Sequence, residues 1–129
     1  MNVPLAIAVL GTGATAATAR FAITTVVARS SDVVFPNRLP HAVLIVNVVG
    51  SLIGGVAAGL ATSGAVSEST RLVLATGVAG GLTTFSTLAV ETLQLVRAGK
   101  APGALRSLAL NLVVGLAVAV AGYAVGLQA

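Results

Sequence analysis

Four long apolar stretches, divided by short polar segments, organise the chain. They cover residues 3–28, 41–62, 72–96 and 104–127. A helix needs about 20 apolar residues to cross the ~30 Å hydrocarbon core of a bilayer, and each stretch is at least that long. We therefore predict an all-α integral membrane protein with four transmembrane helices.

The polar segments between the stretches are short and carry turn chemistry. Residues 29–40 include Ser, Asp, Asn and two prolines, and residues 63–71 hold Ser-Gly followed by Ser-Glu-Ser-Thr. Residues 97–103 read Arg-Ala-Gly-Lys-Ala-Pro-Gly, which is typical of a helix end and a turn. Because short links join neighbouring helices, residues 1–129 are predicted to form one four-helix domain with both termini on the same side.

Composition favours the membrane over water. Of the 129 residues, 57% are hydrophobic and only 8% are charged, whereas a soluble domain has about 25% charged residues. The net charge of +4 comes from scattered Lys and Arg without a basic patch, so we predict no nucleic-acid partner. The absence of cysteine excludes disulfides and thiol chemistry. We expect a multi-pass protein of the cell membrane.

The most unusual segment lies in the middle of the third stretch. Gly77, Gly80 and Gly81 fall within five residues, and four of the five residues 83–87 carry a hydroxyl. Since Gly costs about 1 kcal/mol relative to Ala in a helix, one interpretation is a broken helix whose freed carbonyls could bind a hard cation such as Na⁺. The alternative is a glycine packing face with hydroxyls bonded to the preceding turn. The residues alone leave both open.

Polar residues also interrupt the other stretches. Arg20 lies in the first, and a charge in a spanning helix costs at least ~2.5 kcal/mol, so it usually faces the bundle interior; the alternative is snorkelling to the interface. Asn47, in the second, can donate to an anion or form an interhelical hydrogen bond. In the fourth, Ser107, Asn111 and Gly115 lie one turn apart along a polar stripe.

Glycines recur at a four-residue spacing in three of the stretches, a pattern that lets helix backbones approach closely in lipid. The pairs are Gly50 and Gly54, Gly77 and Gly81, and Gly122 and Gly126. They indicate close packing either within one subunit or between subunits, and the sequence does not decide between these alternatives.

Three motifs, in their order along the chain, resemble the Fluc-type (CrcB) fluoride channels over essentially the whole length. The third stretch carries Gly-Gly-Leu-Thr-Thr-Phe-Ser-Thr at residues 80–87, followed by Glu91. The second carries Val-Asn-Val-Val-Gly-Ser at residues 46–51, with Gly54 beyond, and the first carries Gly13, Ala17, Arg20 and Phe21. The motif of the third stretch is specific, and the other two add weight by their order.

The resemblance implies a passive fluoride channel, not an enzyme. It would be an antiparallel dimer of four-helix subunits with two narrow pores at the interface, and the third helix of each subunit would be broken near its middle. A central structural Na⁺ would be held by the backbone carbonyls of Gly80 and Thr83 from both subunits. Asn47 would donate a hydrogen bond to the anion, and Phe85 would present its electropositive ring edge. The remaining implied roles are a polar track of Ser86, Thr87, Ser107 and Asn111, and a structural Arg20.

Two segments depart from the family pattern. Family members usually carry a second pore-lining Phe three residues after the first, often followed by Ser, and these positions are Leu88 and Ala89 here. The Gly-Thr that precedes the second motif in the family is replaced by Ala42 and Val43. Because leucine has no ring edge, an anion site that needs the second Phe is altered in this chain.

A small four-helix proton-coupled multidrug exporter is the alternative function. Such transporters share the length and hydropathy of this chain and the tendency to form dimers. They need a titratable carboxylate within the first helix, however, and residues 3–28 contain only one charged residue, Arg20. The channel is therefore the preferred hypothesis.

Positive charge is divided unevenly between the two sides of the predicted bundle. Only Arg71 lies on the side of the termini, whereas five basic residues lie at the two links on the other side: Arg29, Arg38, Arg97, Lys100 and Arg106. The positive-inside rule places these two links in the cytoplasm. A subunit fixed in this way cannot pair antiparallel with itself. The partner is therefore a homologous, oppositely oriented subunit in a heterodimer, or a second copy if the chain inserts in both directions.

Overall fold

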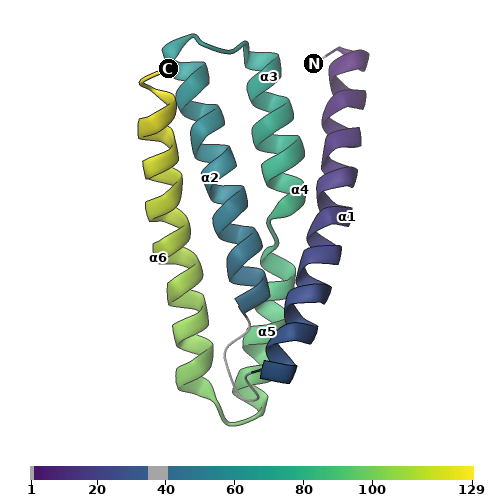
Figure 1. Cartoon of the computed structure of the whole chain (residues 1–129), viewed down its shortest axis with the longest axis vertical. Helices are drawn as coiled ribbons and strands as arrows, with labels where there is room; N and C mark the ends of the chain where they lie inside the picture. The colour runs from purple at the N-terminus through teal and green to yellow at the C-terminus, as the bar shows by residue number, and fades with distance from the viewer. Residues whose placement is uncertain (1, 35–40) are drawn as a thin grey trace.

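The computed structural model describes residues 2–34 and 41–129, and the elements in these ranges are helical. Figure 1 shows them as long columns side by side, with both chain termini at the same end. The elements are α1 (Val3–Val34), α2 (His41–Ser63), α3 (Glu68–Leu72), η1 (Val73–Ala79), α4 (Gly80–Leu82), α5 (Phe85–Arg97) and α6 (Ala101–Gly126). Segments α3 to α5 form the third column. Four spans are long and apolar enough to cross a membrane, which confirms the predicted all-α class.

Several helix ends differ from those expected. Helix α1 continues to Val34, past the expected end at residue 28. Ser67 caps α3, since its hydroxyl accepts the Thr70 N–H at 3.2 Å, so this helix begins before the apolar stretch. Pro102 lies in the first turn of α6 and not in the preceding turn as expected. Proline is tolerated there because the N–H that it lacks would have no partner within the helix.

The link expected between the first two spans is described only in part. Residues 35–40 lie outside the described residues, and with them Arg38 and both prolines of this link. Helix α2 is described from His41 onward, which is the start that the apolar pattern predicted.

Helices α2 and α6 make the most extensive contact in the bundle, and glycines bring their backbones together. A Cβ added at Gly55 or Gly59 would lie within 3.0 Å of main-chain atoms of α6. One added at Gly122 or Gly126 would meet the main chain of α2 in the same way. These glycines therefore serve packing within the subunit, whereas a Cβ at Gly54 would make only ordinary van der Waals contact.

Helix α1 packs against the third column, on the side away from α6 (Figure 1). The buried cluster at the centre joins Ala16 of α1, Val46 of α2 and Leu82 of α4. Apolar side chains also cover the outside of the bundle, where Leu10 and Phe21 are each 72% exposed. In water this surface would be unfavourable, but it suits contact with lipid.

Replacing Gly55 with alanine is expected to destabilise the α2–α6 pair, because the added methyl group would overlap the main chain of Ala119. Overpacking of this kind costs about 1–3 kcal/mol. The detergent-solubilised variant should therefore unfold at a lower temperature than the wild type, as followed by circular dichroism.

Gly54→Ala is the matched control, because its new Cβ would lie 3.7 Å from the Cβ of Ala79. This variant should unfold close to the wild-type temperature. If Gly55→Ala unfolds no earlier than Gly54→Ala, the close approach of α2 and α6 does not contribute to stability as we infer.

Candidate functional site

The third column is interrupted between α4 and α5. Thr83 has φ −80° and ψ 155°, and Thr84 has φ −150° and ψ 123°, so both residues are extended. Figure 1 shows the chain leaving the helix at this point. The glycines that led us to consider a break are themselves helical, and Gly77 and Gly81 lie against α1, where a Cβ would overlap Thr12 and Gly13. The interruption therefore begins after the glycines and has another cause.

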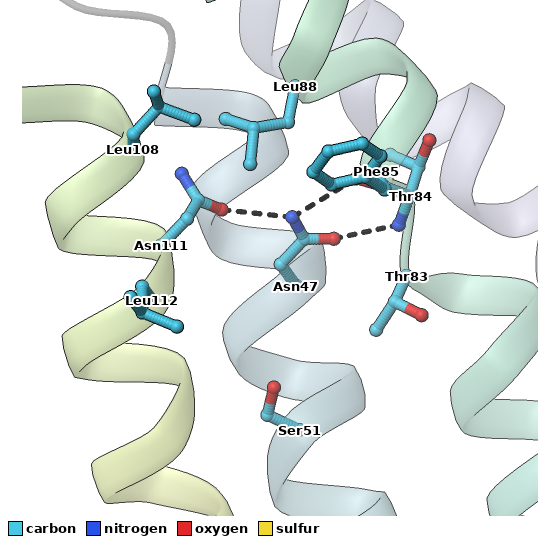
Figure 2. Close-up of a pocket in the computed structure, with 9 residues that line it drawn as sticks. All are labelled: Asn47, Ser51, Thr83, Thr84, Phe85, Leu88, Leu108, Asn111 and Leu112. Carbon is cyan, nitrogen blue, oxygen red and sulfur yellow. Dashed lines mark hydrogen bonds between the residues drawn. The ribbon is translucent and has the colours of Figure 1, made fainter. Parts of the chain in front are cut away.

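The side chain of Asn47 of α2 binds both the main-chain N–H and the main-chain carbonyl of Thr84. Its Oδ1 accepts the Thr84 N–H at 2.8 Å, and its Nδ2 donates to the Thr84 carbonyl at 3.3 Å (Figure 2). A buried peptide group that lies outside a helix needs such partners, because an unpaired one is costly. The amide side chain of Asn47 thus satisfies the N–H of Thr84, which neither helix pairs.

The hydroxyl of Thr84 starts the helix that follows. Thr84 is 8% exposed, and its Oγ1 accepts the Thr87 N–H at 3.2 Å, which is the geometry of a helix N-cap. The hydroxyls of Ser86 and Thr87 lie 3.2 and 3.1 Å from the same oxygen. Three side-chain hydroxyls are therefore gathered at the first turn of α5.

These bonds release two carbonyls of the third column from their usual donors. In a continuous helix the N–H of residue 84 would bind the carbonyl of Gly80, and that of residue 87 would bind the carbonyl of Thr83. Both donors bind elsewhere, to Asn47 and to the Thr84 hydroxyl. Gly80 is also exposed on the subunit surface. The two carbonyls that the sequence suggested as Na⁺ ligands are thus released from helical pairing, so the backbone here fits a cation site.

Arg20 of α1 reaches the same region from the other side of the column. Its Nε donates to the carbonyl of Gly81 at 3.1 Å. The side chain therefore points toward the third column and does not snorkel to the interface. This contact satisfies a third carbonyl next to the break and ties α1 to it.

An open groove of about 530 Å³ lies beside the break (Figure 2). It is bounded by α2, the extended residues, α5 and α6, and its lining residues are Asn47, Ser51, Thr83, Thr84, Phe85, Leu88, Leu108, Asn111 and Leu112. Asn47 and Asn111 meet inside it, where the Nδ2 of Asn47 donates to the Oδ1 of Asn111 at 2.9 Å. Phe85 is 77% exposed at the edge of the groove.

The groove brings together some of the residues suggested from the sequence and leaves others outside. Asn47, Phe85 and Asn111 line it. Ser86 and Thr87 instead lie at the start of α5, within reach of the Thr84 hydroxyl. Ser107 is 4% exposed, and its main-chain carbonyl accepts a hydrogen bond from the Asn111 side chain.

The sequence of the chain matches one known family. Residues 7–123 match the family described as "CrcB-like protein, Camphor Resistance (CrcB)". The chain belongs to the CrcB family. The match confirms the resemblance that the three sequence motifs indicated, and it extends from the first span into the fourth.

Curated relatives of this CrcB chain carry the name "Fluoride-specific ion channel FluC". A relative from Thermus thermophilus is 44% identical over 87 residues, which are 67% of this chain and 68% of the relative. One from Clostridium novyi is 37% identical over 101 residues, or 78% of this chain and 79% of the relative. One from Methylobacillus flagellatus is 38% identical over 112 residues, or 86% of this chain and 85% of the relative.

Several residues of this CrcB site escaped the sequence analysis. Thr84 and Ser51 were quoted only as parts of motifs, although Ser51 follows Asn47 by one helical turn and so shares its face. Leu108 and Leu112 look like ordinary apolar positions of a spanning helix, and no signal marks them. Leu88, which replaces the second Phe, is 6% exposed and lines the groove.

Glu91 of α5 also becomes a candidate functional residue. It was noted only as the end of the third motif. Its Oε2 is buried and has no hydrogen-bond partner among the described residues. Ionisable residues within spanning helices are costly and usually functional, so Glu91 is a candidate in addition to the residues of the groove.

Thr84→Val is expected to remove the cap of α5 while keeping the shape of the side chain. Loss of an N-cap costs about 1 kcal/mol, so the variant should unfold at a lower temperature than the wild type. Thr18→Val is the control, because the Thr18 hydroxyl is exposed and donates to the Ala14 carbonyl of its own helix. Equal unfolding temperatures for the two variants would mean that the Thr84 cap is unimportant.

Proposed function

We propose that this chain is one subunit of a passive, fluoride-selective channel that exports F⁻ from the cytoplasm. The observation that carries the proposal is the groove in which Asn47, Phe85 and Asn111 converge beside the interrupted helix. The chain belongs to a family whose curated relatives are named fluoride-specific ion channels. HF crosses membranes as a neutral acid and releases F⁻ in a less acidic cytoplasm, so a selective pore suffices to let the anion leave.

The chemistry of the groove supports passage of a small anion. Fluoride is strongly hydrated, so a narrow pathway must replace its water with convergent donors. The groove offers the amide of Asn47, to which Asn111 is bonded, and the exposed ring of Phe85 offers electropositive edges. In this proposal the hydroxyls of Ser86, Thr87 and Ser107 continue the polar track, and Arg20 remains structural.

We also propose that two subunits pair antiparallel around a structural Na⁺. Non-helical backbone at membrane depth persists only where protein or a water-filled cavity covers it. Gly80 and Ser86 flank the break and are exposed on a single subunit, which supports a partner that covers them. The carbonyls of Gly80 and Thr83, released from helical pairing, would hold the ion together with those of the partner.

The first test is anion efflux from liposomes that contain the purified protein, followed with fluoride- and chloride-selective electrodes. We expect release of F⁻ and retention of Cl⁻, because the narrow pores that the family resemblance implies would exclude the larger ion. Equal rates for the two halides would rule out the assignment.

Asn47→Asp is expected to abolish fluoride efflux, because aspartate either places a negative charge in the anion path or lacks the amide N–H that donates to the anion. Asn2→Asp is the matched control: Asn2 caps the start of α1 through its Oδ1, which an aspartate can replace, and it lies far from the groove in sequence. Wild-type efflux from a correctly folded Asn47→Asp protein would show that Asn47 only supports packing.

The unequal distribution of Lys and Arg leads to a prediction of membrane orientation. We expect the link at Ala98 to be cytoplasmic and the link at Ala65 to be outside. Figure 1 places these two links at opposite ends of the bundle, and both residues are exposed. Because the chain has no cysteine, Ala65→Cys and Ala98→Cys each give a single site for an impermeant thiol reagent.

Labelling of each site from one side only would favour a heterodimer with a homologous, oppositely oriented subunit. Labelling of each site from both sides in comparable amounts would contradict a fixed orientation and favour a homodimer. Leu88 agrees with the first outcome, since a partner that keeps the second Phe could restore one complete pore.

A further inference from the structure

A chain of three hydrogen bonds crosses the groove from the break to α6. The Thr84 N–H donates to Asn47 Oδ1 at 2.8 Å, and Asn47 Nδ2 donates to Asn111 Oδ1 at 2.9 Å. Asn111 Nδ2 in turn donates to the main-chain carbonyl of Ser107 at 3.0 Å. Figure 2 shows the first two bonds. The extended residue of the third column is thus connected to the backbone of α6 through two asparagine side chains.

The direction of this chain is fixed by its ends. A main-chain N–H can only donate, so the Asn47 atom that pairs with the Thr84 N–H must be the amide oxygen. A main-chain carbonyl can only accept, so the Asn111 atom that faces Ser107 must be the amide nitrogen. The Asn47 nitrogen and the Asn111 oxygen then face each other with the correct polarity. Turning over both amides would place two acceptors together at one end and two donors at the other.

The two hydrogens of the Asn47 amide nitrogen have unequal partners. One binds Asn111 Oδ1 at 2.9 Å, and the other binds the Thr84 carbonyl at 3.3 Å, which is beyond the usual N–H···O range. The second hydrogen is therefore the weaker bound. An anion in the groove could take it without disturbing the other bonds of the Asn47 amide.

We propose that Asn111 is a positioning residue, whose Oδ1 orients the Asn47 amide so that its oxygen holds the Thr84 N–H and its second hydrogen is available to an anion. The assignment of that hydrogen to fluoride rests on the proposed function. The orientation itself does not, because it follows from the hydrogen bonds between the two asparagines and the main chain. Asn111 acts in this role through Asn47, and its own contact with the anion is the competing possibility.

A double-mutant cycle separates these two roles. Asn111→Leu removes the acceptor at similar volume, and the fluoride concentration that gives half-maximal efflux should rise about fivefold, the factor expected for one net hydrogen bond. In an Asn47→Ala background the same substitution should change it by less than about twofold, because the orienting role has no target. Equal effects in both backgrounds would mean that Asn111 contacts the anion itself, which would overturn the proposal.

Hydrogen exchange at the Thr84 amide tests the orientation without any fluoride. If Asn111 holds Asn47 in place, Asn111→Leu and Asn111→Ala should each speed exchange of the Thr84 N–H about fivefold. Asn111→Asp should preserve protection, because a carboxyl oxygen still accepts from Asn47. Thr18→Val is a control for removal of a polar group elsewhere, and it should leave exchange at Thr84 unchanged.

Faster exchange of the Thr84 N–H in Asn111→Leu and Asn111→Ala, with protection kept in Asn111→Asp, supports the proposal. This holds even if Asn47→Ala shows no fluoride efflux and the double-mutant cycle cannot be completed. Unchanged exchange at Thr84 in the Leu and Ala variants overturns it. A wild-type protein that transports no fluoride would refute the proposed function, and the exchange result would still decide the role of Asn111.

Discussion

A main-chain amide without a partner is very costly in hydrocarbon, and this constraint acts on the chain most sharply at Thr84. Helix α4 ends before this residue and α5 begins after it, so neither helix supplies a partner for its N–H, whereas its carbonyl, as that of an N-cap, accepts the first bond of α5. Asn47 accepts from that N–H and also donates to the carbonyl. A side chain of α2 thus replaces the helical ladder over one residue, and the interruption lies where that side chain can reach it.

The reach of Asn47 depends in turn on how closely the backbones approach. A Cβ at Gly50 would overlap the methyl group of Thr83, so this glycine lets the extended segment lie against α2. Gly55 and Gly122 bring α6 equally close on the other side, near enough for Asn111 to bind Asn47. Lipid offers no hydrophobic gain for helix association, so close packing and interhelical hydrogen bonds must stabilise the bundle together.

This dependence explains which features could be predicted from the sequence. The four spans follow directly from apolar length, whereas their ends depend on local caps such as Ser67, which the apolar pattern does not mark. Asn47 was recognisable as a polar residue in an apolar span. The residues alone did not place the break, because it depends on a partner 37 residues earlier in the chain, and two of the glycines that drew attention to it, Gly77 and Gly81, serve packing against α1.

The same break leaves two main-chain carbonyls without helical donors near the outer surface of the subunit. Most of the outside is apolar and suits lipid, but Gly80 and Ser86 are exposed beside two carbonyls that have lost their helical donors. Lipid cannot replace those donors, whereas a cation can, because carbonyl oxygens are its preferred ligands in unwound helices. A cation at the surface of one subunit would in turn face hydrocarbon unless further oxygens covered it. The proposed cation and the proposed second subunit would therefore depend on each other: the cation would pair the released carbonyls, and the second subunit would supply the further oxygens that cover the cation.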